Sequence, residues 1–245
     1  MYFIHLRWVK QNMMSTLTFD IAQFFPSLNH QLLLSILKKT RFDLNVVYFF
    51  SNYLVERKTW YFWNSFSSPF FNIDIGVGQS SALSPILSTL YLASILHILE
   101  KQLKILKIPV SILSFVDNGL LTVQSKSLTI LNDFLFYSFK VTAFFLKKFG
   151  FILKHNKMEV FHFSRSTGMF DPPSLNLSAL RGPILCPKNI WKYLGFYFDR
   201  KLSFHHHINY YTNKTILTIK CMKILGNLTQ GLIPHQKLYP SHCPL

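Results

Sequence analysis

Two aspartates lie where their carboxylates could be brought together to hold metal ions. Asp20 ends a short β-prone run, Thr16 to Ile21 (T-L-T-F-D-I), and Asp117 lies in V-D-N-G between two apolar runs. Phosphoryl transfer to a hydroxyl needs divalent cations held close together by carboxylates from neighbouring strands. A sheet that pairs the two segments would place both side chains at one edge. A lone Asp at a strand end is more often a turn or capping residue, so either one alone indicates little.

The segment around Asp117 predicts a β-hairpin. Apolar runs from Val110 to Phe115 and from Leu120 to Val123 flank the pair Asn118-Gly119. An Asn-Gly pair between two apolar runs is a strong hairpin signal. We therefore expect Asp117 at the hairpin tip, with the Asn-Gly pair forming the turn.

Helical and strand periodicities order the rest of the chain. Apolar residues recur at helical spacing in long segments, and short β-prone runs separate them. Gly150 and Gly226 follow two of these segments, where a glycine commonly ends a helix. The expected helices are Asn29 to Lys39, Leu44 to Val55, Ser84 to Ile105, Leu128 to Phe149 and His205 to Leu225. Further strands are expected at Thr59 to Asn64, at its hairpin partner Phe70 to Ile75, at Met158 to Phe163 and at Trp191 to Phe198.

This order of elements favours an α+β fold, with one sheet and helices packed against it. The segment from Ser84 to Ile105 is apolar on most sides, so we expect this helix to be buried and to cross beneath the sheet. The chain of 245 residues is 49% hydrophobic, which is enough to fill a substantial core.

The charge balance indicates a polyanionic partner. The chain has 26 Lys and Arg against 10 Asp and Glu, a formal net charge of +16. Such an excess attracts nucleic acid and makes binding depend on salt. Chance loss of acidic residues in a decaying gene would produce the same excess, so charge alone leaves both interpretations open.

Several other classes of protein fit poorly. The longest uncharged stretch is mainly apolar only from Ile86 to Leu99, which is short for a membrane span of ~20 residues. The first ten residues lack the apolar core of a secretory signal. The three cysteines form no C-x-x-C pair, and the run of three histidines has no Cys or carboxylate at zinc-ligand spacing. We expect an intracellular protein without stable membrane insertion.

Five motifs in order resemble the reverse transcriptases of non-LTR (LINE-like) retrotransposons, with wording closest to fungal elements. Together they extend over about residues 15–231, and their order makes the resemblance specific. The motifs are F-D-I-A-Q-F-F-P-S-L-N-H (Phe19 to His30), G-V-G-Q-S-S-A-L-S-P-I-L (Gly76 to Leu87), F-V-D-N (Phe115 to Asn118), F-G-F-I-L-K-H-N-K-M-E (Phe149 to Glu159) and W-K-Y-L-G-F-Y-F-D (Trp191 to Asp199).

The resemblance implies an RNA-directed DNA polymerase with a palm of antiparallel sheet backed by helices. Its cofactors would be two Mg²⁺ ions, with Asp20 and Asp117 as the metal-binding carboxylates. Its partners would be an RNA template, a DNA primer and deoxynucleotide triphosphates, and no protein partner is inferred. An enzyme of this family acts in the nucleus, which is the location we expect if this chain does the same.

The same resemblance assigns a nucleotide and template pocket. Phe25 would pack under the incoming sugar and reject a 2′-hydroxyl, and packing in the core is the equally weighted alternative. Gln79, Ser80 and Ser81 would line the pocket, because a glycine-rich turn that opens a helix lets the backbone approach a nucleic acid closely. An ordinary helix start is the alternative for these three residues.

Two further roles follow from the resemblance. Lys157 would protonate the pyrophosphate leaving group, and the alternative is a solvated surface charge. Leu194 and Gly195 would form the primer grip against the primer end, whereas Gly195 is equally explained as a plain turn.

The sequence departs from the family pattern at the third and second motifs. Asn118 stands where the family has a second Asp, which removes one negative charge beside the expected metals. Ser80 replaces a family Gly and adds a Cβ where a special backbone conformation can be needed. These departures predict weak or no polymerase activity.

The resemblance also divides the chain. Residues 1–164 would be the palm, 165–231 the primer-grip strand with the start of a thumb, and 232–245 a divergent tail. The fingers region that precedes the palm in the family is expected to be largely missing, which describes a truncated, degenerate copy. Two functions stay open: a polymerase domain fragment of a retrotransposon, or a catalytically inactive, basic nucleic-acid-binding remnant of one.

Overall fold

The computed structural model describes residues 13–79, 81–165 and 172–226. The chain divides into two compact units, Met1–Lys188 and Asn189–Leu245. The predicted boundary between residues 164 and 165 stays a prediction.

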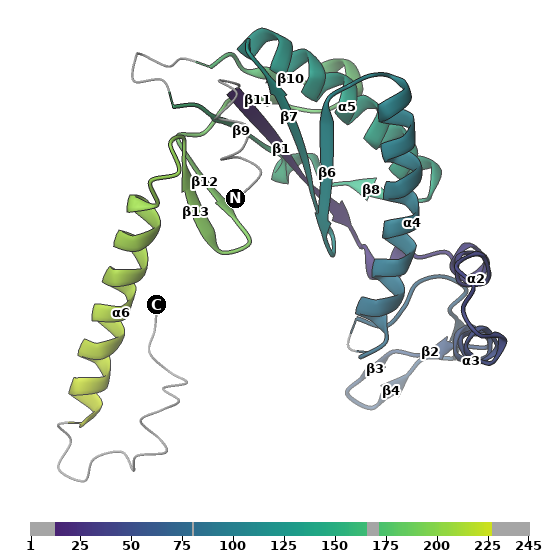
Figure 1. Cartoon of the computed structure of the whole chain (residues 1–245). Helices are drawn as coiled ribbons and strands as arrows, with labels where there is room; N and C mark the ends of the chain where they lie inside the picture. Colours follow the sequence, from purple (N-terminus) through teal and green to yellow (C-terminus); the bar gives the residue numbers. More distant parts are fainter. Residues whose placement is uncertain (1–12, 80, 166–171, 227–245) are drawn as a thin grey trace. The chain divides into compact units, whose positions relative to one another are not determined.

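The centre of the first unit is a five-stranded antiparallel sheet built around strand β1, Met13–Ala22 (Figure 1). Most of β1 is buried, since strands flank it on both edges and helices pack against it. Two of the sheet's other strands form a hairpin, and two come later in the chain and pair with β1. Its other members are β6 (Val110–Phe115), β7 (Asn118–Ser125), β8 (Ile152–Leu153) and β9 (Glu159–Phe163). β1 pairs with β7 on one edge and with β9 and β8 on the other, and β6 pairs with β7.

Two long helices, α4 (Ser84–Ile105) and α5 (Leu128–Lys148), lie on one face of this sheet (Figure 1). Each buries one side of its surface, as helical spacing of apolar residues requires. α5 buries Leu131, Leu135, Phe139 and Leu146. Gly150, with φ of +85°, follows the end of α5. The predicted α+β fold, the bounds of α4 and the end of α5 are confirmed.

Two shorter helices, α2 (His30–Lys39) and α3 (Leu44–Leu54), pack against each other and connect β1 to α4. The Asn29 side chain caps α2 by accepting a 2.9 Å hydrogen bond from the backbone N–H of Leu32. Before α2 lies the short 3-10 turn η1, Phe25–Ser27. Both helices begin and end within one residue of the predicted bounds.

The hairpin predicted between Thr59 and Ile75 is present, but it is not one continuous ladder. It consists of two short pairs separated by irregular residues around Trp60 and Pro69. The outer pair is β2 (Lys58–Thr59) with β5 (Phe71–Asn72), and the inner pair is β3 (Phe62–Trp63) with β4 (Phe66–Ser67). The register changes by one residue between the pairs, because Thr59 faces Phe71 whereas Phe62 faces Ser67.

The remainder of the first unit is short elements: η2 (His155–Lys157), β10 (Leu175–Asn176), η3 (Ser178–Leu180) and β11 (Ile184–Leu185). The second unit holds the hairpin β12 (Ile190–Tyr193) and β13 (Phe196–Asp199), followed by α6 (His205–Gly226). The single strand predicted from Trp191 to Phe198 is therefore wrong. The chain reverses at Leu194 and Gly195, where φ is positive at +47° and +85°.

Candidate active site

Asp20 and Asp117 lie at the same end of two neighbouring strands. Asp20 is directly opposite Asn118 in the antiparallel pair of β1 and β7. The backbone N–H of Ile21 donates a 2.9 Å hydrogen bond to the carbonyl oxygen of Asp117. Asp20 is 5% exposed and Asp117 is half-buried. The fold thus brings together two acidic residues from distant parts of the sequence, as predicted for a sheet that pairs these two segments.

Asp117 lies at the hairpin tip as predicted, but the predicted Asn-Gly turn is wrong. The turn consists of Val116 and Asp117, and Asn118 is already paired with Phe115 in the β6–β7 ladder. Val116 has φ of +55°, a strained conformation for a β-branched residue. Gly119 serves another purpose, because a Cβ there would lie 2.1 Å from the ring of Phe19. The glycine permits close packing between β1 and β7, and the turn itself is made by Val116 and Asp117, of which Val116 has the strained backbone.

Two lysines hold the carboxylate of Asp20. Lys157 Nζ donates a 2.9 Å hydrogen bond to Oδ2, and Lys154 Nζ forms an ion pair with Oδ1 at 2.8 Å. Burial by itself raises the pKa of the Asp20 carboxyl, but the two ammonium groups outweigh burial and lower that pKa below its ordinary value. The hydrogen bond and negative charge of Asp20 raise the pKa of Lys157, with a further contribution from the charge of Asp117.

Lys157 therefore contacts the predicted metal-binding carboxylate directly, so it is not a free surface charge. Lys154 was not among the predicted site residues. It is brought to Asp20 by the short β1–β8 pair, and its backbone N–H also donates a 2.9 Å hydrogen bond to the carbonyl oxygen of Asp20. The available sequence signal was the second lysine three residues before Lys157.

The donor atoms at this end of the sheet suit a hard cation. Carboxylate oxygens are the ligands that Mg²⁺ prefers. Asp20 Oδ1 is buried and receives an ion pair from Lys154 but no well-directed hydrogen bond. Asp117 Oδ1 accepts a 3.1 Å hydrogen bond from the Asn118 amide. Within the described residues no three side chains of His, Cys, Asp or Glu gather to hold a metal, so a cation here would rest on two carboxylates.

The second-motif loop lies against the first-motif segment. The N–H of Gly76 donates to the carbonyl oxygen of Leu28 at 2.7 Å, and the N–H of Val77 donates to that of Phe25 at 2.9 Å. Gly76 has φ of +82°, and a Cβ there would lie 2.6 Å from the carbonyl oxygen of Pro26. The Phe25 ring itself is half-buried, edge-on to Phe24 at 5.4 Å, and packs on the core. Its packing role is present, and its role toward a sugar stays a prediction.

One side chain from α3 and one that follows this helix hold the second-motif loop in place. The Tyr53 hydroxyl donates a 3.0 Å hydrogen bond to Ser81 Oγ, which also accepts one from the N–H of Leu83. Arg57 Nη1 donates to the carbonyl oxygen of Gly76 at 2.9 Å. Gln79 is exposed. Ser81 thus takes part in the start of α4, the plainer of its two predicted roles, and Ser80 lies outside the described residues.

Leu194 and Gly195 form the turn of the β12–β13 hairpin in the second unit. The Tyr211 hydroxyl from α6 donates a 3.0 Å hydrogen bond to the carbonyl oxygen of Gly195. Trp191 contacts Phe198 across the hairpin, and the ring of His207 from α6 contacts Phe196 and Tyr197. The turn that the sequence predicted is present, and its contact with a primer stays a prediction.

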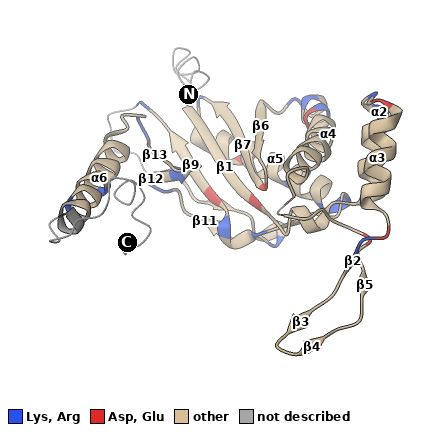
Figure 2. Cartoon of the chain, turned by 90° about the horizontal axis from the view of Figure 1, so that it is seen from below, with Lys and Arg blue, Asp and Glu red and all other residues tan. Residues whose placement is uncertain are grey.

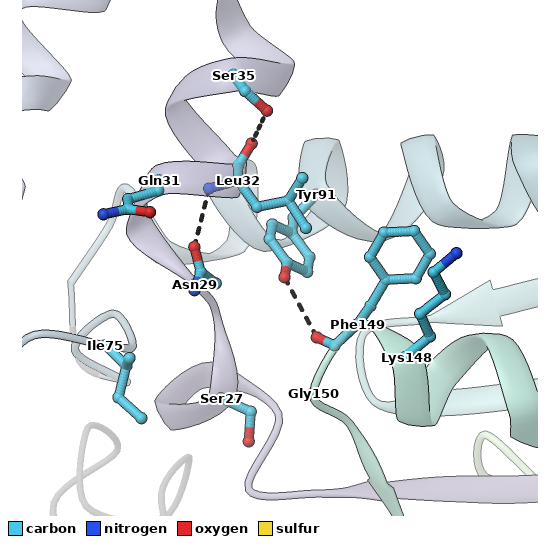
Figure 3. Close-up of a pocket in the computed structure, with 10 residues that line it drawn as sticks. All are labelled: Ser27, Asn29, Gln31, Leu32, Ser35, Ile75, Tyr91, Lys148, Phe149 and Gly150. Carbon is cyan, nitrogen blue, oxygen red and sulfur yellow. Dashed lines mark hydrogen bonds between the residues drawn. The ribbon is translucent and has the colours of Figure 1, made fainter.

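A pocket of about 650 Å³ opens between the start of α2 and the end of α5 (Figure 3). Tyr91 lies at its base and donates a 3.4 Å hydrogen bond to the carbonyl oxygen of Phe149. Burial raises the pKa of Tyr91, and a backbone hydrogen bond at Asn29 partly offsets this. Lys148 lies at its rim (Figure 3). None of the predicted site residues lines this pocket.

The described part of the first unit therefore has the architecture of a polymerase palm: an antiparallel sheet backed by two helices, with two aspartates at one end of adjacent strands. The family model for reverse transcriptase (RNA-dependent DNA polymerase) matches residues 5–198. The chain belongs to this family.

The solved structures with the same fold include telomerases. The apo telomerase of Candida tropicalis, truncated from its C-terminal domain, aligns with a TM-score of 0.54 at 15% identity, over 83% of this chain and 38% of that one. The Candida albicans telomerase in complex with a TWJ fragment of telomeric RNA aligns with a TM-score of 0.50 at 14% identity, over 82% and 33%. This chain thus spans about a third of their length. A search of the curated proteins finds no match.

Proposed function

We propose that this chain is an RNA-directed DNA polymerase domain of a non-LTR retrotransposon. The observation that carries the proposal is the pairing of β1 with β7, which brings Asp20 of the first motif beside Asp117 of the third. The family match covers both residues. Its substrates are an RNA template, a DNA primer and deoxynucleotide triphosphates, and its place of action is the nucleus.

In this proposal Asp20 and Asp117 hold two Mg²⁺ ions, which supply charge stabilisation to the transferring phosphoryl group when bound. Asp20 is already ionised at neutral pH, because Lys154 and Lys157 lower the pKa of its carboxyl. Lys157 keeps its proton, since Asp20 raises the pKa of that ammonium group. It is therefore a proton donor that could serve a leaving group near Asp20. Gly76 and Ser81, bonded by Arg57 and Tyr53, belong to the second-motif segment that would supply the surface beside Phe25 for the nucleotide.

A second candidate is a catalytically inactive nucleic-acid-binding remnant of such a polymerase. Two observations favour it. Asn118 is a neutral amide beside Asp117, and its side-chain N–H donates a hydrogen bond to the Asp117 carboxylate. Lys154 and Lys157 together place two positive charges on the buried carboxylate of Asp20, which opposes the approach of a cation. In that case the formal net charge of +16 would serve to bind nucleic acid.

Labelled-primer extension on a homopolymer RNA template, with Mg²⁺, separates the two candidates. We expect trace extension by the chain, loss of it in Asp117→Ala, and an increase in Asn118→Asp. Each ~1.4 kcal/mol restored at a metal site is about tenfold in rate, so the size of the increase measures the charge stabilisation that Asn118→Asp restores. Asp133→Ala is the matched control, because Asp133 is an exposed aspartate on α5. No extension by either the chain or Asn118→Asp, with template binding intact, would leave the second candidate.

A further inference from the structure

A projecting β-hairpin carries an unusual concentration of exposed rings. We call residues 57–73 the aromatic arm. Figure 2 shows it as a long two-stranded extension from the first unit, tan along its length, with charged residues only at its base. Between Arg57 and Ile73 the sequence has one lysine, Lys58, and no acidic residue.

The rings of the aromatic arm face solvent on both sides. Phe62 and Trp63 are consecutive residues of β3, so their side chains point to opposite faces, and they are 70% and 78% exposed. The rings also lie in pairs, Trp60 with Phe70 at 5.2 Å and Tyr61 with Phe71 at 5.8 Å between centroids. Exposed apolar surface of this extent marks a binding surface. The exposed aromatic residues of the arm are Trp60, Tyr61, Phe62, Trp63, Phe66, Phe70 and Phe71.

The base of the aromatic arm is fixed to the second-motif loop. The N–H of Ile73 donates a 2.8 Å hydrogen bond to the carbonyl oxygen of Arg57, which closes the hairpin. The Arg57 side chain then reaches the carbonyl oxygen of Gly76 at 2.9 Å and lies 5.9 Å from the centre of the Tyr53 ring. Ile75 bridges to Asn29 of the first-motif segment. The arm is therefore continuous with the surface proposed to face the nucleotide and template.

Charge decides which partner these rings fit. Two copies of a chain with a formal charge of +16 repel each other, which opposes docking of one arm on another. The same charge attracts a nucleic acid, and the arm has no acidic side chain to oppose it. Every base has a flat face that stacks on an aromatic ring, whereas a duplex hides these faces inside its own stack. The partner that matches both features is a single strand with unpaired bases.

We propose that the aromatic arm binds single-stranded RNA by stacking unpaired bases on its rings. This inference deepens the proposed function and rests on it, because the bound strand would be the template before it pairs with the primer. The phosphates of the strand would be held by basic residues elsewhere on the chain. Sequence preference should be weak, since stacking does not read base edges.

The test uses the full chain and fluorescence anisotropy with a labelled 20-nucleotide oligo(A), beside a labelled duplex of equal length. We expect Trp60→Ala/Trp63→Ala to bind the single strand about tenfold or more weakly, and the duplex within about twofold of the parent. The salt dependence of the remaining binding should be unchanged, because no phosphate contact is lost. Phe144→Ala is the matched control, since Phe144 is 65% exposed on α5 and far from the arm in sequence.

A second double variant guards against misfolding. It also tests whether flat rings are sufficient for binding or whether the larger tryptophan side chain is needed. Trp60→Phe/Trp63→Phe keeps flat rings and should retain single-strand binding, while the quenching of tryptophan emission by oligo(A) should largely disappear. For this readout both proteins also carry Trp8→Phe, so that Trp191 is the one tryptophan left in the variant, and Trp191 is 4% exposed and should not respond. Equal single-strand affinity in the alanine variant and the parent would overturn the proposal. Equal losses on single strand and duplex would also overturn it, as would a loss of self-association or of binding to neutral vesicles with RNA binding intact.

The same variants distinguish a failure of the aromatic-arm inference from a failure of the polymerase assignment. Asp117→Ala should bind oligo(A) as the parent does, since the proposed stacking does not involve that carboxylate. If extension depends on Asp117 while the arm variants bind normally, only the role of the arm is wrong. If extension is absent but the alanine variant loses single-strand binding, only the polymerase assignment is wrong.

Discussion

Lys157 and Asp20 are joined by a 2.9 Å hydrogen bond across 137 positions of sequence. Asp20 lies in the most buried strand of the sheet, and its side chain is 7% exposed. A carboxylate at such a position is stable only with positive charge beside it. Lys154 supplies a second such charge at 2.8 Å. The pair of lysines therefore stabilises the end of β1 on which the candidate site depends.

Removing both lysines should change how stability depends on pH. In the parent the pKa of Asp20 is lowered, so its contribution is present above the ordinary pKa of 3.8 and is lost as pH falls below it. In Lys154→Met/Lys157→Met, burial alone should raise that pKa, and the variant should lose stability as pH rises toward 7. Urea unfolding at pH 4 and pH 7 measures the difference. Lys140→Met, at an exposed position of α5, should behave as the parent at both values. If the variant and the parent showed the same difference in stability between pH 4 and pH 7, the two ion pairs would contribute nothing.

The buried His162 should make the fold sensitive to acid. It is 2% exposed beside Ser15 on the adjacent strand, and burial lowers its pKa from 6.5 to about 4. Protonation therefore favours the unfolded chain, so stability should fall as pH drops from 6.5 toward 4, by about 3 kcal/mol in total. His162→Leu/Ser15→Ala should flatten this dependence, whereas His205→Gln, at an exposed histidine, should leave it unchanged. An unchanged slope in the double variant would place the acid sensitivity elsewhere.

A side chain at Gly119 should disrupt the contact between β1 and β7. The Cβ of Gly119→Ala would lie 2.1 Å from the Phe19 ring, and overpacking of this kind costs about 1–3 kcal/mol. The second-site change Phe19→Leu should restore part of the loss. Gly78→Ala is the control, because its Cβ would meet only the Arg57 side chain at 3.6 Å. Thermal unfolding compares the three. Similar midpoints for the two glycine variants would mean that Phe19 moves aside without cost.

Asp199 should be required for the start of α6. Its carboxylate accepts hydrogen bonds from the N–H groups of Lys201, Ser203 and Phe204 at 3.0, 3.1 and 2.8 Å, and from the Ser203 hydroxyl at 2.9 Å. These donors lie in the turn that precedes α6, so the carboxylate holds the approach to the helix, and loss of such a hydrogen bond typically costs about 1 kcal/mol. Asp199→Ala should therefore reduce the helical circular dichroism signal and lower the unfolding midpoint, and Asp199→Asn should do so less. Asp133→Ala, on the exposed side of α5, should change neither.

The helices and the site carboxylates were predictable because their signals are local. Apolar spacing along Ser84–Ile105 defines the buried face of α4 within one continuous segment, and the bounds follow from it. The same holds for α2, α3 and most of α5. Asp20 and Asp117 were predictable as a pair because each lies in a motif that resembles the family pattern, whereas a strand end or a hairpin tip alone indicates little.

The tertiary structure alone decided the features that depend on contacts between distant segments. Gly119 reads as a turn residue until the ring of Phe19, one hundred positions earlier, is seen to occupy the space of its missing Cβ. Lys154 becomes a site residue only because β8 pairs with the end of β1. The sequence by itself determined where the helices and most of the strands lie, since backbone periodicity is set by neighbouring residues. Which strands pair, and which side chains meet at their ends, is set by burial in the common core, because that energy depends on all the segments at once.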